Sequence, residues 1–377
     1  MHMVNHERIA IGILTMGDRL KGFRGNRSRF REWCMYGSKV GFDVFVIPHD
    51  GIDLSRMTVR AYRYVPTRGT WLEQFIDRPK IIYNRIPNRQ DEQLVEVKRL
   101  LRSLARNKEV SLFNPRFFNK WTLIRWLIRT RSMRRYVPKS WSLRKGLPLA
   151  KLLRRYKRLY LKPVHGMAGS GIMVARLYRS RGDQYGLSKQ MPTSASAAVK
   201  VSRFASSEAW RQAIWREIGE ERYMLQQGID LVRHAGRPFD LRLLLQKNRH
   251  GKWTVTGIGA RVAGASSLTT HVPRGGSIAN PAALLREALG RTKTTSLMRK
   301  LRKLAPRVAR QIERASGDEL GELSMDVGVD VSGKLWLFEA NAKPMSFDEP
   351  AIHERALNNF FNYCRYLHNR NKARLQR

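Results

Sequence analysis

Residues 318–349 read DELGELSMDVGVDVSGKLWLFEANAKPMSFDE, and this acidic segment carries the strongest signal in the chain. It contains 8 of the 30 carboxylates in a protein with a formal net charge of +42. Solubility does not require acids to gather in one segment of a basic protein. A hard divalent cation such as Mg²⁺ does, because it takes oxygen ligands, usually a few carboxylates together with substrate phosphates. The segment therefore predicts a metal and nucleotide site.

The same segment has the pattern of an antiparallel hairpin. Two alternating stretches flank a Ser-Gly turn at 332–333, which predicts two paired strands. Glu339 and Asn341 are two residues apart, so their side chains leave one face of the second strand. Asp326 on the first strand meets them if the register allows. We expect Asp326, Glu339 and Asn341 to hold Mg²⁺ in a metal hairpin over 322–345; a solvated hairpin with scattered acids is the alternative.

A glycine-rich loop is the second candidate for nucleotide binding. Residues 161–172 read LKPVHGMAGSGI, a strand end followed by a loop over 163–172. Glycines allow backbone amides to approach phosphate oxygens closely, and Lys162 at the strand end supplies positive charge. The loop lacks the Lys-Ser/Thr of a Walker motif. A plain flexible turn is the alternative.

Two arginines accompany this loop. Asp240 and Arg242 share a face at the start of a long apolar strand, and Arg261 lies on the strand that should return beside it. An arginine can fork onto two phosphate oxygens and neutralise charge on a transferring phosphoryl group. A salt bridge at a sheet edge is the alternative.

The remaining charge is strongly basic. Residues 98–158 hold 20 Lys or Arg against one acid, Glu109. Such density attracts polyanions: an anionic polymer or surface, or nucleic acid without sequence preference. A cationic surface with no specific partner is the alternative. Trp121 and Trp126 interleave the run as on a nucleic-acid surface, but their neighbours have the spacing of a helix core face.

Length and composition limit the remaining possibilities. A chain of 377 residues with 42% apolar content is expected to form two or three globular domains. No apolar run approaches the 18 or so residues that span a bilayer, and the first residues do not read as a secretory signal, so we expect a soluble, cytoplasmic protein. Cys34 and Cys364 lack metal-type spacing and are expected to be idle, buried thiols.

Strand and helix patterns divide the chain into units. We expect an N-terminal α/β domain over 1–115, a second unit with central and C-terminal parts over 116–365, and a basic tail over 366–377. Expected strands cover 9–15, 42–48, 80–83, 159–163, 223–227, 240–247 and 253–262. Expected helices cover 29–40, 90–105, 120–130 and 281–315, and residues 186–207 are expected to form a surface loop with a short strand.

In their order along the chain, these motifs resemble the ATP-grasp superfamily, as in D-alanine:D-alanine ligase and glutathione synthetase. More narrowly, FNKW at 118–121, KPVHGMAGSGI at 162–172, DLRLLLQ at 240–246 and FEANAKP at 338–344 are similar to the YheC/YheD family of endospore coat-associated proteins. The resemblance covers roughly 115–365. It implies an α/β (α+β) ATP-grasp fold behind an N-terminal α/β domain of the pre-ATP-grasp kind.

The resemblance also implies roles for single residues. Lys120 and Lys162 would contact the α- and β-phosphates of ATP, and the loop would close over them. Asn341 and the two carboxylates would hold one or two Mg²⁺, with Mn²⁺ as a possible substitute. His271 stands in TTHVPRGG where the superfamily often has Asn, and it can still donate a hydrogen bond. The residues assigned to cofactor binding are Lys120, Lys162, His165, Gly166, Gly169, Gly171, Gln226, Gln227, Ile229 and Asp240; those assigned to catalysis are Arg242, Arg261 and His271.

The implied activity is an ATP-dependent carboxylate–amine ligase that acts through an acyl phosphate and is associated with endospore formation. The basic surface favours an acidic or polymeric acceptor. One alternative is a nucleotide-binding spore coat protein with little catalysis, located in the sporulating cell or the coat. The other is a nonspecific nucleic-acid or polyanion binder, although no nucleic-acid motif is present.

Overall fold

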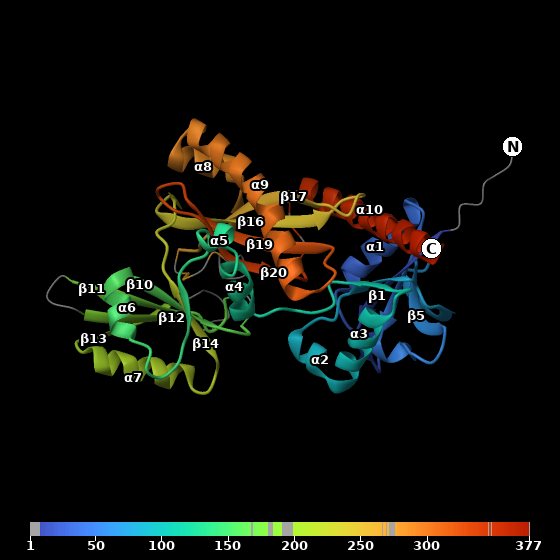
Figure 1. Ribbon diagram of the computed structural model, residues 1–377, viewed down its shortest axis with the longest axis horizontal. Helices are drawn as coiled ribbons and strands as arrows, with labels where there is room; N and C mark the ends of the chain where they lie inside the picture. Colours follow the sequence, from blue (N-terminus) through green and yellow to red (C-terminus); the bar gives the residue numbers. More distant parts are fainter. Residues whose placement is uncertain are drawn as a thin grey trace.

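The structure is a computed structural model that describes residues 8–166, 169–179, 184–190, 199–265, 267, 268, 270, 276–345, 347 and 349–376. Within these residues the chain forms three six-stranded sheets and a two-stranded ribbon. The molecule is elongated, with the N-terminal sheet at one end, the second sheet at the other and the third between them (Figure 1). Among the described residues, no helix is long and apolar enough to cross a membrane.

The N-terminal sheet has the strand order β6-β5-β4-β1-β7-β8. Four adjacent strands, β4, β1, β7 and β8, are parallel, as the alternation of apolar strands and helices predicts. An antiparallel hairpin, β5–β6, extends one edge and was not predicted. The strands are β1 (Ile9–Thr15), β4 (Phe42–Pro48), β5 (Thr58–Val65), β6 (Thr70–Asp77), β7 (Ile81–Asn84) and β8 (Ser111–Phe113).

Helices cover both faces of this sheet. The helices are α1 (Arg27–Lys39), α2 (Arg89–Gln93), α3 (Val95–Arg106) and α10 (Pro350–Leu375). α3 packs on one face, while α1 and α10 pack on the other. The predicted helix over 90–105 is divided at Leu94, which leaves the helical conformation. The C-terminal helix thus returns to the first sheet (Figure 1).

The second sheet is antiparallel, in the order β13-β12-β11-β10-β14-β9. Helices α6 (Leu149–Tyr156) and α7 (Ser207–Ile218) bury their apolar sides against it. Most of the described part of 186–207 belongs to two strands rather than to the predicted surface loop, because its alternating residues pair across the sheet edge. The strands are β9 (Ser140–Ser142), β10 (Arg158–Pro163), β11 (Met173–Tyr178), β12 (Gln184–Gln190), β13 (Val199–Phe204) and β14 (Tyr223–Gln227).

The third sheet has the order β18-β17-β16-β19-β20, with β15 paired to β16. α4 (Lys120–Ile128), α5 (Arg131–Arg134), α8 (Pro281–Leu289) and α9 (Arg291–Ser316) surround it. The strands are β15 (Arg233–His234), β16 (Arg237–Lys247), β17 (Trp253–Val262), β18 (Ser277–Ala279), β19 (Glu322–Val329) and β20 (Leu335–Asn341).

The structure tests three local predictions: the long basic helix, the two tryptophans and the two cysteines. The basic helix predicted over 281–315 is two helices, because Gly290 takes a φ of +80° between them. Trp121 and Trp126 pack against the core of the third sheet, so they are core residues rather than a stacking platform for bases. Cys34 and Cys364 are both free and buried, as expected.

Candidate nucleotide and metal site

A cavity of about 320 Å³ lies between the second and third sheets. Strands β10, β11 and β14 supply one wall, β16, β17, β19 and β20 supply the other, and α4 contributes Lys120. Eleven of the predicted site residues line it: Lys120, Lys162, Gly166, Gly169, Gln226, Gln227, Ile229, Asp240, Arg261, Asp326 and Glu339. Residues from five separate predicted motifs therefore meet in one place.

Lys162 is the central cation of the second-sheet wall. It leaves β10 next to β14, and its Nζ donates a hydrogen bond to Oε1 of Gln226 at 2.7 Å. The Gln226 amide in turn donates to Oγ of Ser140 at 3.1 Å. Burial lowers the pKa of Lys162 to about 8, although the nearby Glu339 opposes the shift. The lysine is therefore held in place and loses its proton at a lower pH than an exposed lysine does.

Residues 226–229, which the ATP-grasp resemblance implies to be the hinge that contacts adenine, span the end of β14. The amide of Gln227 donates to the Lys139 carbonyl at 2.8 Å, and the amide of Gly228 donates to the Arg158 carbonyl at 2.8 Å. Ile229 lines the cavity, and its carbonyl accepts from the Arg158 guanidinium. In this conformation the hinge offers a base an apolar surface rather than these two amides. Arg158 is a cavity residue that the motifs did not predict, because it precedes the glycine loop as one basic residue among many.

The third-sheet wall carries the carboxylates. Asp326 on β19 and Glu339 on β20 are direct cross-strand partners, which brings their side chains together on one face of the hairpin. Arg261 donates to both oxygens of Asp240 at 3.1 Å and lies 2.9 Å from Oδ2 of Asp326. Burial disfavours the charge on Arg261, but Asp326 and Asp240 outweigh it and raise the pKa of the guanidinium. One arginine thus balances two buried acids.

A β-bulge shapes this wall. The pairing shifts between Asp326 and Val327, so β20 carries one extra residue, Phe338, opposite β19. Adjacent strand residues normally point to opposite faces, yet Phe338 and Glu339 both line the cavity. A bulge re-aims side chains in this manner. Sequence alternation alone places Phe338 on the opposite face from Glu339, which is why Phe338 was not predicted.

Lys120 links the two walls. Its Nζ donates to the Gly166 carbonyl of the glycine loop and lies 3.9 Å from Oε1 of Glu339. Burial lowers the pKa of Lys120, and Glu339 opposes that shift. The loop itself is tied to the N-terminal sheet unit by Arg89 of α2, which donates to the His165 carbonyl at 3.3 Å. Arg89 is therefore one contact by which the N-terminal unit touches the glycine loop.

Two predicted residues lie beside the cavity rather than in its lining. Arg242 is opposite Asp326 in the register of β16 and β19, and its guanidinium lies 5.5 Å from the ring centre of Phe347. Asn341 pairs with Ser324, two cross-strand positions beyond Glu339. Both extend the polar face of the third sheet past the carboxylates, toward the start of α10.

Three further predicted residues, from two loops, are not among the described residues that line the cavity. Gly171 has a φ of +69°, and its carbonyl accepts from the hydroxyl of Tyr223 at 2.9 Å, which fixes the end of the glycine loop. His165 is exposed, and burial together with Arg89 lowers its pKa. His271 lies outside the described residues, so its assigned role stays a prediction.

The donor set at the hairpin fits Mg²⁺. Asp326 and Glu339 supply hard carboxylate oxygens, and Asn341 is two residues further along β20. Within the described ranges, no group of three or more His, Cys, Asp or Glu side chains gathers as a metal site. Mg²⁺ is commonly bound through one or two carboxylates plus substrate phosphates and water. The pair is therefore sufficient for a cation that arrives with a nucleotide, and too sparse for a site that holds a metal without one.

Comparison with known proteins agrees with this geometry. A family model described as YheC/D like ATP-grasp matches residues 109–367. Endospore coat-associated protein YheD of Bacillus subtilis (strain 168) is 27% identical over 95% of this chain and 78% of its own length. Endospore coat-associated protein YheC of the same organism is 23% identical over 80% of this chain and 81% of its own length.

Solved structures agree on the fold. The VanG D-Ala:D-Ser ligase of Enterococcus faecalis matches 95% of this chain and 99% of its own, with a TM-score of 0.51 and 12% identity. D-alanyl-alanine synthetase A of Vibrio cholerae O1 biovar eltor str. N16961 matches 98% and 99%, with a TM-score of 0.51 and 10% identity. These likenesses confirm the predicted ATP-grasp fold of mixed α/β type. Because the family model covers well over half of its length, the chain belongs to the YheC/D-like ATP-grasp family.

Proposed function

We propose that the protein binds ATP with Mg²⁺ and is an ATP-dependent carboxylate–amine ligase. One observation carries the proposal: Lys120 and Lys162 lie in the same cavity as the carboxylate pair of Asp326 and Glu339, and Arg261 bridges Asp326 to Asp240. Cations for phosphate oxygens and carboxylates for a divalent metal are the two halves of a nucleotide-triphosphate site.

The chain's own residues act by position and charge. Lys162 and Lys120 bind phosphate oxygens from the two sides of the glycine loop, and the loop amides approach them closely. Asp326, Glu339 and Asn341 would hold Mg²⁺, which neutralises phosphate charge when bound. Phosphoryl transfer asks for little covalent work from the protein, so fixed charges and alignment supply most of the rate.

The acceptor carboxylate is proposed to lie next to Arg242. This arginine leaves the same face of β16 as Asp240 and is opposite Asp326, so it continues the cationic row from Arg261 away from the nucleotide. A forked guanidinium suits a carboxylate, and later an acyl phosphate. An amine would then displace phosphate from that acyl phosphate.

Glu339→Gln tests the metal half of the proposal. It removes one hard anionic ligand and retains the shape of the side chain. We expect ATP affinity of the variant, measured by calorimetry at high salt, to lose its dependence on Mg²⁺. The matched control is Glu354→Gln, because Glu354 is exposed on α10 and does not line the cavity. Equal Mg²⁺ dependence in both variants would refute the metal assignment.

Ligase activity needs a separate test, because ATP binding alone fits the alternative of a nucleotide-binding coat protein, which the names of the two relatives favour. Trapping with hydroxylamine converts an acyl phosphate into a hydroxamate. We expect ADP release and hydroxamate only when an acceptor carboxylate is present, and loss of both in Arg242→Ala. Tight Mg·ATP binding without ADP release across a broad carboxylate panel would favour the role of a nucleotide-binding coat protein. Both roles would belong to endospore formation.

A further inference from the structure

A second cavity lies in the N-terminal sheet unit, away from the proposed nucleotide site. It has a volume of about 1030 Å³, and none of the described residues lines both cavities. It opens beyond the carboxyl end of β4, between the start of α1, the β5–β6 hairpin and the ribbon β2 (Gly17–Asp18) and β3 (Gly22–Phe23). In open α/β sheets, ligands bind at this edge.

The β2–β3 ribbon packs tightly against the sheet unit, so that its glycines leave no room for a side chain. A Cβ on Gly17 would lie 2.5 Å from Oδ1 of Asp50, and a Cβ on Gly22 would lie 2.6 Å from the hydroxyl of Tyr62. Gly22 also has a φ of +77°, which favours glycine. The amide of Gly17 donates to Nδ1 of His49 at 3.1 Å. The cavity wall is therefore a packed structure rather than an open surface loop.

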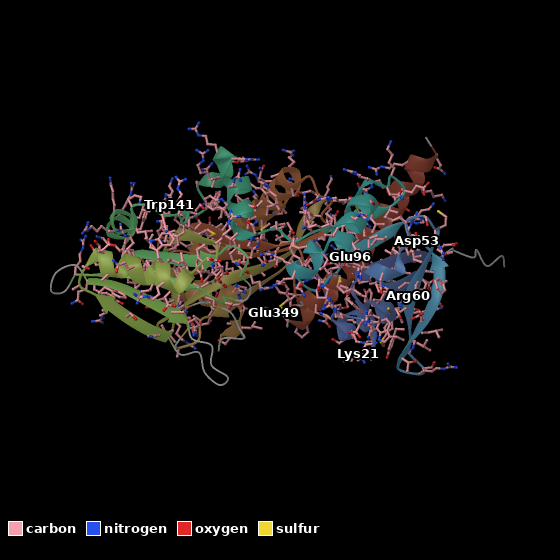
Figure 2. The ribbon with its side chains drawn as sticks, turned by 90° about the horizontal axis from the view of Figure 1, so that it is seen from below. Lys21, Asp53, Arg60, Glu96, Trp141 and Glu349 are labelled. Carbon is pink, nitrogen blue, oxygen red and sulfur yellow. The ribbon has the colours of Figure 1, made fainter. Side chains whose placement is uncertain are left out.

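Unbalanced positive charge lines this cavity. Arg60 is neutralised by Asp50 at 3.1 Å and Glu73 at 3.6 Å. Arg19 and Lys21 on the ribbon turn and Arg31 on α1 also line the cavity. Within the described part of the chain none of these three has a carboxylate at ion-pair distance, although Asp18, also in the lining, attracts Lys21. Three cations converging from two elements favour a ligand with phosphate or carboxylate groups. Figure 2 shows Lys21 and Arg60 in this unit, with Trp141 of the second sheet at the opposite end of the molecule.

The rest of the lining suits a hydroxyl-bearing ring. The side chains of Asp50 and Glu73 are about half exposed, at 51% and 49%, so each retains oxygens that accept hydrogen bonds from ligand hydroxyls. Trp71 on β6 is half-buried and forms an aromatic side of the cavity. Ligand pockets combine aromatic walls with a few polar groups that orient the ligand. The carboxylates of Asp50 and Glu73 would repel a ligand that carries only anionic groups, such as inorganic phosphate.

We propose that this cavity binds an acidic carbohydrate, a sugar that carries phosphate or carboxylate groups. Arg19, Lys21 and Arg31 bind the anionic group. The acids beside Arg60 accept from ring hydroxyls, and Trp71 contacts the apolar face of the ring. The site is independent of ATP-dependent chemistry and stands even if the ligase proposal fails.

Calorimetry with glucose 6-phosphate, glucuronate, glucose and inorganic phosphate tests this proposal at a salt concentration that suppresses nonspecific anion binding. We expect at least one acidic sugar to bind more tightly than both glucose and inorganic phosphate. Preference between the two acidic sugars identifies the anionic group. Loss of one charged contact, in Lys21→Ala or Arg31→Ala, is expected to weaken binding about tenfold or more. Both side chains are exposed and form no ion pair with another described residue, so we expect the variants to fold.

Arg299→Ala is the matched control, since Arg299 is an exposed arginine on α9, outside the cavity. It is expected to leave sugar binding unchanged, and Arg31→Ala is expected to leave Mg·ATP affinity unchanged. The proposal is overturned if no acidic sugar binds better than inorganic phosphate, or if Arg299→Ala and Arg31→Ala weaken binding equally. Either result would assign the effect to overall positive charge.

Discussion

Arg261 shows how single residues balance the charge of the site. It bridges Asp240 and Asp326, and all three side chains are buried. Two buried carboxylates without a cation are costly. The arginine therefore stabilises the folded protein in the absence of nucleotide, in the place where a metal would later add positive charge.

Arg261→Met is expected to lower the free energy of unfolding by about 3–5 kcal/mol, because it leaves a buried charge uncompensated. With ATP present, Mg²⁺ should restore part of this loss, since a divalent cation at Asp326 replaces the missing charge. Urea unfolding with ATP, in the presence and absence of Mg²⁺, measures both effects, with Arg299→Met as control. The same loss with ATP at every Mg²⁺ concentration would show that Asp326 does not face a metal.

Lys162 gives the site a pH dependence. Its pKa is lowered to about 8 by burial, against the attraction of Glu339, Asp326 and Asp240 and together with repulsion from Lys120. Phosphate oxygens bind the protonated amine, so ATP binding must take up a proton once the pH exceeds this pKa. Affinity is therefore expected to fall as the pH rises through about 8, by about tenfold for one pH unit.

Calorimetry in two buffers with different ionisation enthalpies detects this proton uptake at alkaline pH. Lys162→Arg keeps its charge throughout the range, so its ATP affinity should stay level where that of the wild type declines. Lys120 also has a lowered pKa and is unchanged in the variant. An equal decline in both proteins would assign the titration to Lys120 instead.

At the scale of elements, the β19–β20 hairpin joins the metal ligands to the aromatic wall of the cavity. The bulge at Phe338 requires its ring to lie over Gly328, where a Cβ would collide with the ring and lie 2.7 Å from the Leu231 side chain. Lys162 Nζ lies 5.6 Å from the same ring. The position of Phe338 thus depends on the absence of a side chain on the neighbouring strand.

Gly328→Ala is expected to displace Phe338 and to weaken nucleotide binding several-fold, because a bulge fixes the direction of its side chains. Mg²⁺-dependent ATP calorimetry measures the effect. Gly333→Ala, in the turn of the same hairpin, is the control: its φ of +87° also disfavours alanine, but its Cβ would touch only Leu289 at 4.0 Å. Similar ATP affinity in wild type and Gly328→Ala would remove the bulge from the binding argument.

Sequence patterns predicted the features that neighbouring residues determine, such as the hairpin, and missed those that depend on contacts between distant residues. Alternation and the Ser-Gly turn predicted the hairpin, and its register does pair Asp326 with Glu339. The bulge could not be predicted, because it depends on the contact between Phe338 and Gly328 on separate strands. The β5–β6 hairpin was missed for a similar reason: Trp71 of this edge strand packs against Phe23, far from it in the sequence. Arg158 and Arg89 were hidden among 72 basic residues.

At the scale of the whole molecule, part of the hydrophobic core of the N-terminal sheet is supplied by α10, from the other end of the sequence. α10 places Phe360 against Trp33, with ring centres 5.2 Å apart, and adds Phe361 and Leu367 to the same cluster. Arg370 donates to Glu319, which connects the helix to the third sheet. The proposed boundary at residue 115 therefore divides the sequence, but the core of the first unit includes side chains from beyond that boundary.

A fragment of residues 1–115 is expected to be unfolded or aggregated, because one face of its sheet would expose aromatic side chains. Adding a peptide of residues 350–376 should restore cooperative unfolding, measured by circular dichroism and proteolysis. The control peptide carries Phe360→Asp and Phe361→Asp. A stable, protease-resistant fragment without the peptide would show that α10 is only an accessory helix.

The return of α10 to the first sheet has a consequence for how the chain is made. Ribosomes add about 5–20 residues per second, so the partner helix of β1 emerges on the order of tens of seconds after the strand itself. During that interval α1 covers only part of this face, and the aromatic side chains that α10 will bury stay exposed. We therefore expect a nascent chain of this protein to need shielding, for example by a chaperone, until α10 has been synthesised.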